Sequence, residues 1–158
     1  MGGAVGKIRI VIVDEDEVMR HGLRRTLELE PDMEVVGEAP TGEKAVRLAR
    51  TKRPDLVLLD TKLPDIDAPE VCKRVLAQAP EVAVLMLTGH LQYEMISRSM
   101  TAGARGYVLK NVEIAELKKI VRSVHCGTSF VDPTIAPQVV AAVKTAAKAA
   151  DAIRKLPF

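Results

Sequence analysis

Four short apolar runs, each followed by a side chain with ionic or hydrogen-bonding chemistry, constrain what this chain can fold into. The runs are Ile10–Val13, Leu56–Leu59, Val84–Leu87 and Tyr107–Leu109. Runs of this length without polar alternation are typical of strands buried on both faces of a parallel sheet. The residues that follow the runs are Asp14, Glu15, Asp16, Asp60, Thr88 and Lys110. Because ligands bind beyond the carboxyl ends of such strands, we expect these side chains to converge at one edge of the sheet.

Stretches with helical periodicity separate these runs. Apolar residues recur every three to four positions over Val18–Leu27 and again over Ile114–Val124. Met33–Ala39 is more polar, as expected for an edge strand, and Thr41 is a candidate N-cap for the helix after it. Regular alternation of strands and helices is typical of a parallel sheet covered by helices on both faces. The five strand–helix units therefore predict an α/β, flavodoxin-like (βα)5 three-layer sandwich with parallel strands in the order 2-1-3-4-5.

Size and composition fit one globular domain. The chain has 158 residues, of which 47% are hydrophobic, and it carries 23 Lys and Arg against 21 Asp and Glu. The basic residues are scattered in pairs, which argues against nucleic acid as a direct partner of this chain. The apolar runs are too short to span a membrane and no signal-peptide pattern is present, so we expect a cytoplasmic protein. Cys72 and Cys126 lack the spacing of a metal or disulfide framework and are expected to be reduced, buried thiols.

The composition shifts toward alanine near the C-terminus. Asp132 followed by Pro133 is typical of a helix cap with a first-turn proline. Apolar residues then recur at alternating intervals of three and four, and they are Ala136, Val139, Val143, Ala146, Ala150 and Ile153. We therefore divide the chain into a domain at residues 7–131 and a C-terminal helix at residues 132–158. This alanine-rich helix either packs back on the domain or serves as a linker or dimerisation helix.

The residues at the predicted strand ends can support phosphoryl transfer. Clustered carboxylates repel one another, and a bound divalent cation relieves this repulsion. Mg²⁺ needs only one or two carboxylate ligands, because water and phosphate oxygens fill its other coordination positions. Asp60 ends an aliphatic run, where a carboxylate is costly to bury without a partner. Its carboxylate can attack phosphorus and form an acyl phosphate. The cation, the Lys110 ammonium and the Thr88 hydroxyl would neutralise charge on the equatorial oxygens.

Four stretches of the sequence carry a resemblance to a known family. They are IVIVDEDEVMRHGLRRTL, PDLVLLDTKLPDID, VLMLTGH and AGARGYVLKN. Over about Lys7 to Asp132 the chain resembles the receiver domain of two-component response regulators, most closely the NarL/LuxR-like transcription regulators. The resemblance implies that Asp60 is the phosphoacceptor. It also implies a sensor histidine kinase or a small phosphodonor as the phosphoryl source and Mg²⁺ or Mn²⁺ as the cofactor.

The same resemblance implies a ligand set for the metal. Asp14 and Glu15 match the acidic pair that holds the ion, with Glu15 at the direct-ligand position, and Asp60 is a further ligand. Lys62, two residues beyond Asp60, matches the position that supplies a backbone carbonyl. Glu15 stands where aspartate is usual, and Asp16 is a candidate to compensate for its longer side chain.

The resemblance also implies a conformational switch. Thr88 matches the hydroxyl that follows the phosphoryl group, Lys110 the ion-pairing lysine, and Tyr107 the aromatic residue that rotates inward on activation. The change would reach the surface made by the fourth helix, fifth strand and fifth helix. We expect a homodimer to form through that surface or through the C-terminal helix.

Departures from the family pattern leave other functions open. Regulators of this subgroup continue into a DNA-binding domain that this sequence lacks, so we expect either the receiver portion of a longer protein or a stand-alone receiver, with DNA bound only through an output domain. Glu15, and Ala68 in place of a usual glycine, are compatible with a degenerate receiver that binds a partner without phosphorylation. An aspartyl-phosphate phosphohydrolase of the haloacid dehalogenase type needs an aspartate where Lys62 stands. We therefore expect no enzyme activity beyond the domain's own phosphoryl transfer and autodephosphorylation.

Overall fold

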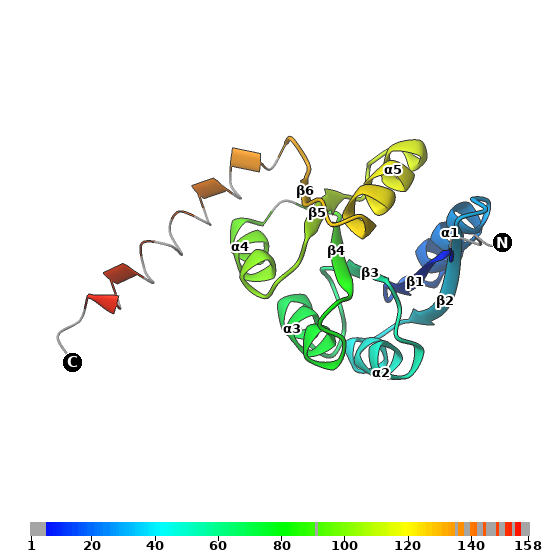
Figure 1. Ribbon diagram of the computed structural model, residues 1–158, viewed down its shortest axis with the longest axis horizontal. Coiled ribbons are helices and arrows are strands. Elements are labelled where there is room, and N and C mark those ends of the chain that lie inside the picture. Colours follow the sequence, from blue (N-terminus) through cyan, green and yellow to red (C-terminus); the bar gives the residue numbers. More distant parts are fainter. Residues whose placement is uncertain are drawn as a thin grey trace.

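The computed structural model describes residues 6–90, 92–134, 136–137, 140–141, 144, 148, 151–152 and 154–155. Strands and helices alternate along the chain, as the sequence pattern predicted (Figure 1). The strands are β1 (Ile8–Val13), β2 (Met33–Ala39), β3 (Leu56–Asp60), β4 (Ala83–Thr88), β5 (Gly106–Leu109) and β6 (Phe130–Val131). The helices are α1 (Glu17–Glu28), α2 (Gly42–Lys52), α3 (Ala68–Gln78), α4 (Tyr93–Thr101) and α5 (Ile114–His125).

Within the described residues, no helix is both long and apolar enough to cross a membrane.

The sheet is parallel throughout the part of the chain that is described, with strands in the order β2-β1-β3-β4-β5-β6. The predicted flavodoxin-like order 2-1-3-4-5 is confirmed. The short strand β6 is an addition that the sequence did not indicate. Its residues Phe130 and Val131 pair with Gly106 and Tyr107 of β5 and extend the sheet by one edge strand.

Two apolar cores fill the spaces between the sheet and its helices. Val11 and Val13 of β1 belong to the core beneath α2, α3 and α4, whereas Ile10 and Ile12 belong to the core beneath α1 and α5. This division arises because successive side chains of a strand point to opposite faces of the sheet. Burial on both faces explains why the strand-forming runs show no polar alternation.

Helix caps lie at the edge of the sheet where the strands have their carboxyl ends. Asp16 caps α1, Thr41 caps α2 and Asp67 caps α3, each by accepting hydrogen bonds from amides of the first helical turn. Thr41 is the cap that the sequence predicted. Pro69 lies in the first turn of α3, where its missing amide leaves no helical hydrogen bond unmade.

Ion pairs fasten α5 to the loop between α1 and β2, at the opposite edge of the sheet. The Arg122 guanidinium donates to both carboxylate oxygens of Asp32, at 2.9 and 3.0 Å, and also to Glu30. Lys118 pairs with the same Glu30 at 3.0 Å. Bidentate pairing of arginine with a carboxylate restricts geometry as well as distance, so α5 is held in place on the sheet at this end.

The C-terminal segment is described in part. Its described residues from Ala136 to Arg154 are helical. Of the predicted heptad-like stripe, only Ala136 belongs to the described residues, and the other members (Val139, Val143, Ala146, Ala150 and Ile153) lie outside them. The boundary between residues 131 and 132 stays a prediction.

The two cysteines differ in burial. Cys72 is buried in α3, as predicted, and burial raises the pKa of its thiol to about 12. Cys126 is exposed, so the prediction of a buried thiol is wrong at this position. Val124 is the last buried residue of α5, and Cys126 lies two residues beyond it, at the C-cap of the helix.

Candidate functional site

A cavity of about 610 Å³ opens at the carboxyl edge of the sheet. Residues from the ends of β1, β3, β4 and β5 line it, among them Asp14, Glu15, Asp60, Lys62, Thr88 and Lys110. The structure therefore brings together the residues that the sequence placed at the strand ends. Tyr107 is not part of the lining, because its side chain lies inside the core.

Lys110 lies between two buried carboxylates. Its Nζ is 3.0 Å from Oδ2 of Asp14 and 3.2 Å from Oδ1 of Asp60. Asp14 is 2% exposed and Asp60 is 5% exposed. Carboxylates this buried require a partner, and one ammonium serves both of them.

The directions in which burial and neighbouring charges shift the pKa values of Asp60 and Lys110 indicate that one cation does not balance the site. Burial raises the pKa of Asp60 and the charge of Asp14 raises it further, while Lys110 and the Lys62 backbone amide oppose the increase. Burial lowers the pKa of Lys110, but the hydrogen bond to Asp14 and the charges of Asp60 and Asp14 outweigh it, so the pKa is raised. Lys110 therefore keeps its proton at neutral pH, and the two carboxylates still repel each other.

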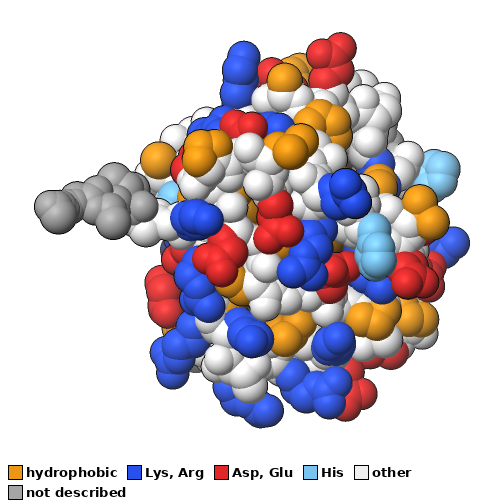
Figure 2. Space-filling model, turned by 90° about the vertical axis from the view of Figure 1, so that its right-hand side faces the viewer, with side chains coloured by type: hydrophobic (Ala, Val, Ile, Leu, Met, Phe, Trp, Pro, Cys, Tyr) orange, Lys and Arg blue, Asp and Glu red, His pale blue; other side chains and the backbone are white. Residues whose placement is uncertain are grey.

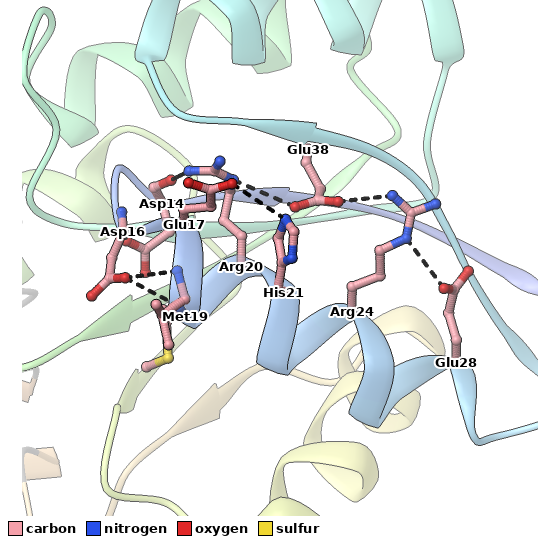
Figure 3. Close-up of polar contacts among 10 residues, drawn as sticks. Asp14, Asp16, Glu17, Met19, Arg20, His21, Arg24, Glu28 and Glu38 are labelled. Carbon is pink, nitrogen blue, oxygen red and sulfur yellow. Dashed lines mark hydrogen bonds and ion pairs between the residues drawn. The ribbon is translucent and has the colours of Figure 1, made fainter.

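The backbone of Asp14 is fixed from both α1 and β2. Arg20 Nη1 donates to the Asp14 carbonyl at 2.7 Å, and Arg20 Nε lies 3.4 Å from a carboxylate oxygen of Glu38 on β2 (Figure 3). The Asp14 amide donates to the carbonyl of Ala39, the residue after Glu38, at 3.0 Å. Glu38 also pairs with Arg24 at 2.8 Å. Basic and acidic side chains lie next to one another over this face (Figure 2).

Arg20 was not predicted from the sequence. An arginine on an amphipathic helix resembles a solvated surface residue, and its two partners are far from it in sequence or belong to the backbone. Its burial is the feature that distinguishes it, since its side chain is only 12% exposed. Arg20 thus links the acidic end of β1 to the neighbouring strand.

Glu15 and Asp16 are both exposed and line the cavity, but they differ in what they contact. The Asp16 carboxylate accepts hydrogen bonds from the first turn of α1, and the Asp16 amide donates to Asp14 Oδ1 at 2.8 Å. Asp16 is therefore engaged as a helix cap through Oδ1, and its role in compensating for the longer Glu15 stays a prediction. Among the described side chains, Glu15 has no ion-pair partner, which leaves its carboxylate available to a cation.

The donor set fits Mg²⁺ or Mn²⁺ better than a metal that requires a complete protein cage. Within the described residues, no three carboxylate, imidazole or thiol groups are placed together as a ready-made metal centre. Mg²⁺ is commonly held by one or two carboxylates and keeps several waters. Asp14 and Asp60 supply buried oxygens beside a cavity with room for those waters. The Lys62 carbonyl stays a predicted ligand.

The Thr88 hydroxyl is turned toward the loop that follows β4. It donates to the His90 carbonyl at 2.8 Å, and the hydroxyl of Thr61 contacts it at 2.9 Å. Thr61 is a second residue that was not predicted from the sequence, because a single threonine in a loop carries no pattern. Tyr107 is fully buried, so the inward position that the resemblance associates with activation is the one present in this structure.

The Tyr107 hydroxyl is an unusual feature of the core below Thr88. It has no hydrogen-bond partner among the described residues. Burial raises the pKa of the phenol, although Thr88 is close enough to oppose the increase. A buried hydroxyl without a partner costs free energy, so this part of the core gains stability from any arrangement that supplies one.

Replacing Asp60 with a neutral isostere should stabilise the protein. The pKa of Asp60 is higher in the folded protein than the unfolded value of 3.8, so ionisation of Asp60 opposes folding as the pH rises above that value. We expect Asp60→Asn to melt a few degrees higher than the wild type at neutral pH, with the difference vanishing below about pH 4. Thermal unfolding across this pH range without divalent cations measures the effect.

Asp32→Asn is the matched control, because its pKa shift has the opposite sign. The hydrogen bond to Arg122 holds the pKa of Asp32 below its usual value, so this substitution should lower the melting temperature at neutral pH and have no effect at low pH. An Asp60→Asn protein that melts below the wild type at every pH would contradict the electrostatic account.

Arg20 and Arg24 offer a matched pair for testing how Asp14 is held. Both pair with Glu38, but only Arg20 contacts Asp14. We expect Arg20→Met to weaken Mg²⁺ binding about tenfold, as loss of a group that orients a metal ligand does. Arg24→Met should leave Mg²⁺ affinity close to that of the wild type. Calorimetric titration with MgCl₂ measures both, and equal affinities in the two variants would show that Arg20 does not orient Asp14.

Comparisons with known proteins give one consistent family. Residues 10–122 match the response regulator receiver domain. The chain is 36% identical over 132 residues to the response regulator UvrY of Escherichia coli (strain K12), covering 84% of this chain and 61% of UvrY. It is 34% identical over 149 residues to the DNA-binding transcriptional activator DevR/DosR of Mycobacterium tuberculosis, covering 94% of this chain and 69% of that protein. The chain therefore spans between about three fifths and two thirds of the length of these relatives.

A solved structure agrees with the sequence relatives. The crystal structure of a LuxR-family two-component response regulator from Aurantimonas sp. SI85-9A1 matches with a TM-score of 0.79 and 31% identity, covering 85% of this chain and 96% of that one. The resemblance found in the four sequence stretches is thereby confirmed. The chain belongs to the receiver domain family of two-component response regulators and is of the NarL/LuxR-like type.

Proposed function

We propose that this chain is the phosphoacceptor receiver of a transcriptional response regulator, with Asp60 as the residue that is phosphorylated. The observation that supports this most strongly is the placement of Asp60. Its buried carboxylate opens on the cavity and has the Lys110 ammonium 3.2 Å away. Nucleophile and charge-neutralising group are thus already beside each other.

The residues of the chain have distinct roles in the proposed transfer. Asp14, Glu15, Asp60 and the Lys62 backbone carbonyl would hold Mg²⁺ or Mn²⁺, and the bound ion supplies positive charge to the phosphoryl oxygens. An Asp60 oxygen forms the new bond to phosphorus as the bond to the donor's imidazole nitrogen or acetate oxygen breaks. Lys110 neutralises part of the charge on the equatorial oxygens.

Phosphorylation would then change the surface formed by α4, β5 and α5. Thr88 would leave the His90 carbonyl and donate to a phosphoryl oxygen, and a minor conformation would gain population. Because Tyr107 already lies inside the core, the movement begins with Thr88. Arg122 and Lys118 fasten α5 to the loop before β2, so we expect α4 to move more than α5.

The partners follow from this assignment. We propose a sensor histidine kinase or a small phosphodonor as the phosphoryl source and the cytoplasm as the location. Residues 7–131 would form the receiver, and residues 132–158 a linker or dimerisation helix. A homodimer would form through the surface of α4, β5 and α5 or through that helix. DNA would be bound through an output domain. The name of the relative DevR/DosR describes that protein as a DNA-binding transcriptional activator.

Intact mass after incubation with acetyl phosphate and Mg²⁺ tests the assignment of Asp60. We expect one phosphoryl adduct on the wild type and none on Asp60→Asn, because the amide is not a nucleophile for phosphorus. Asp67→Asn is the matched control, since Asp67 lines the same cavity and should keep the adduct. A wild type that takes up no phosphoryl group and binds no Mg²⁺ would instead support a receiver that binds its partner without phosphorylation.

The proposed switch is tested by association state. We expect Thr88→Ala and Tyr107→Ala to accept the phosphoryl group on Asp60 but to lose the change in association that phosphorylation causes in the wild type. Sedimentation velocity with and without acetyl phosphate measures that change. Thr51→Ala, an exposed threonine on α2, should respond like the wild type. If both Thr88→Ala and Tyr107→Ala also respond like the wild type, the switch runs through other residues.

A further inference from the structure

Thr61 lies between two residues with proposed roles, Asp60 and Lys62, and lines the same cavity. Its backbone amide donates to the carbonyl of Leu87 at 3.3 Å, which ties the start of the loop after β3 to the end of β4. Its hydroxyl is 2.9 Å from the Thr88 hydroxyl. Thr61 is therefore held by its backbone and side chain against the strand that carries Thr88.

The direction of the hydrogen bonds follows from the number of protons. Thr88 has one hydroxyl proton, and the His90 carbonyl at 2.8 Å can only accept. Thr88 therefore donates to His90 and accepts from Thr61. The His90 amide also donates to Thr88, at 3.3 Å. The two hydroxyls and the carbonyl thus form one chain that runs from Thr61 through Thr88 to His90.

This chain favours one orientation of Thr88. A hydroxyl that accepts a hydrogen bond becomes a better donor, so the bond from Thr61 strengthens the bond from Thr88 to His90. Thr88 is 2% exposed, which limits how easily water replaces either bond. A Thr88 hydroxyl that turns to a phosphoryl oxygen on Asp60 has to give up the His90 carbonyl, because it has no second proton.

We propose that Thr61 is a positioning residue that holds the Thr88 hydroxyl toward His90 and opposes its turn toward the phosphoryl group. The inference rests on the proposed roles of Asp60 and Thr88. It assigns a function to the side chain directly after the phosphoacceptor. Thr61 would set how readily occupation of Asp60 is converted into movement of Thr88.

The first test needs no phosphoryl group. The stabilities of the wild type, Thr61→Val, Thr88→Val and the double variant are compared by urea unfolding with Mg²⁺ present. We expect the two substitutions to be coupled by about 2- to 12-fold in the unfolding constant, the effect of one hydrogen bond. Additive effects would overturn the proposed contact, whether or not Asp60 is phosphorylated in the wild type.

The second test uses BeF₃⁻ as a mimic of the phosphoryl group, titrated in the presence of Mg²⁺. We expect Thr61→Val to bind it about 2- to 12-fold more tightly than the wild type, because Thr88 then turns at lower cost. Thr61→Ser, which keeps the hydroxyl, should bind like the wild type. In a Thr88→Val background, Thr61→Val should have no effect.

Two results of this second test would overturn the proposal. Unchanged or weaker BeF₃⁻ binding by Thr61→Val would show that Thr61 does not oppose the turn of Thr88. An equal gain in the Thr88→Val background would show that Thr61 acts on the ligand directly. The proposed function itself would fail in a different measurement, if intact mass showed no phosphoryl adduct on Asp60 of the wild type.

Discussion

The Lys110 ammonium between the carboxylates of Asp14 and Asp60 is the interaction on which the candidate site depends. These three groups come from the ends of β5, β1 and β3, so their contact requires the strand order that places those ends at one edge of the sheet. Two buried carboxylates without this ammonium would be ionised at a high desolvation cost or protonated. The ion pairs therefore favour the ionised form of Asp60, the proposed nucleophile, although burying this carboxylate costs some stability of the fold.

The two sides of this ion-pair cluster differ in how firmly they are held, with the backbone of Asp14 fixed on one side and the hydroxyl of Thr88 free to change its partner in the proposed switch on the other. Arg20 and the Ala39 carbonyl fix the backbone of Asp14, and Arg122 fastens α5 at the opposite edge of the sheet. On the other side, the Thr88 hydroxyl contacts the Thr61 hydroxyl and the His90 carbonyl, and the proposed switch would exchange that carbonyl for a phosphoryl oxygen. A rigid acidic site beside a hydroxyl that can change its acceptor is the arrangement that the proposed phosphorylation switch requires.

The strands that leave a pattern of apolar residues in the sequence could be predicted from it. The buried strands and the edge strand Met33–Ala39 were predicted correctly, because burial on two faces, or on one, leaves a distinct pattern of apolar residues. Strand β6 was missed because two residues carry no periodicity, and its pairing depends on β5. Arg20 and Thr61 were missed for a related reason. Each has its role only through a partner that is distant in sequence, so no spacing identifies it.

The net negative charge of the site explains why the proposed phosphoryl transfer needs a divalent cation. Asp14, Glu15 and Asp60 with Lys110 carry two net negative charges when the acids are ionised. Conversion of Asp60 to an acyl phosphate with a doubly charged phosphoryl group adds one more. The single positive charge of Lys110, which pairs with both Asp14 and Asp60, is already included in this total. A bound Mg²⁺ brings the same groups to one net negative charge, which a partly buried edge of the sheet accommodates far better than three.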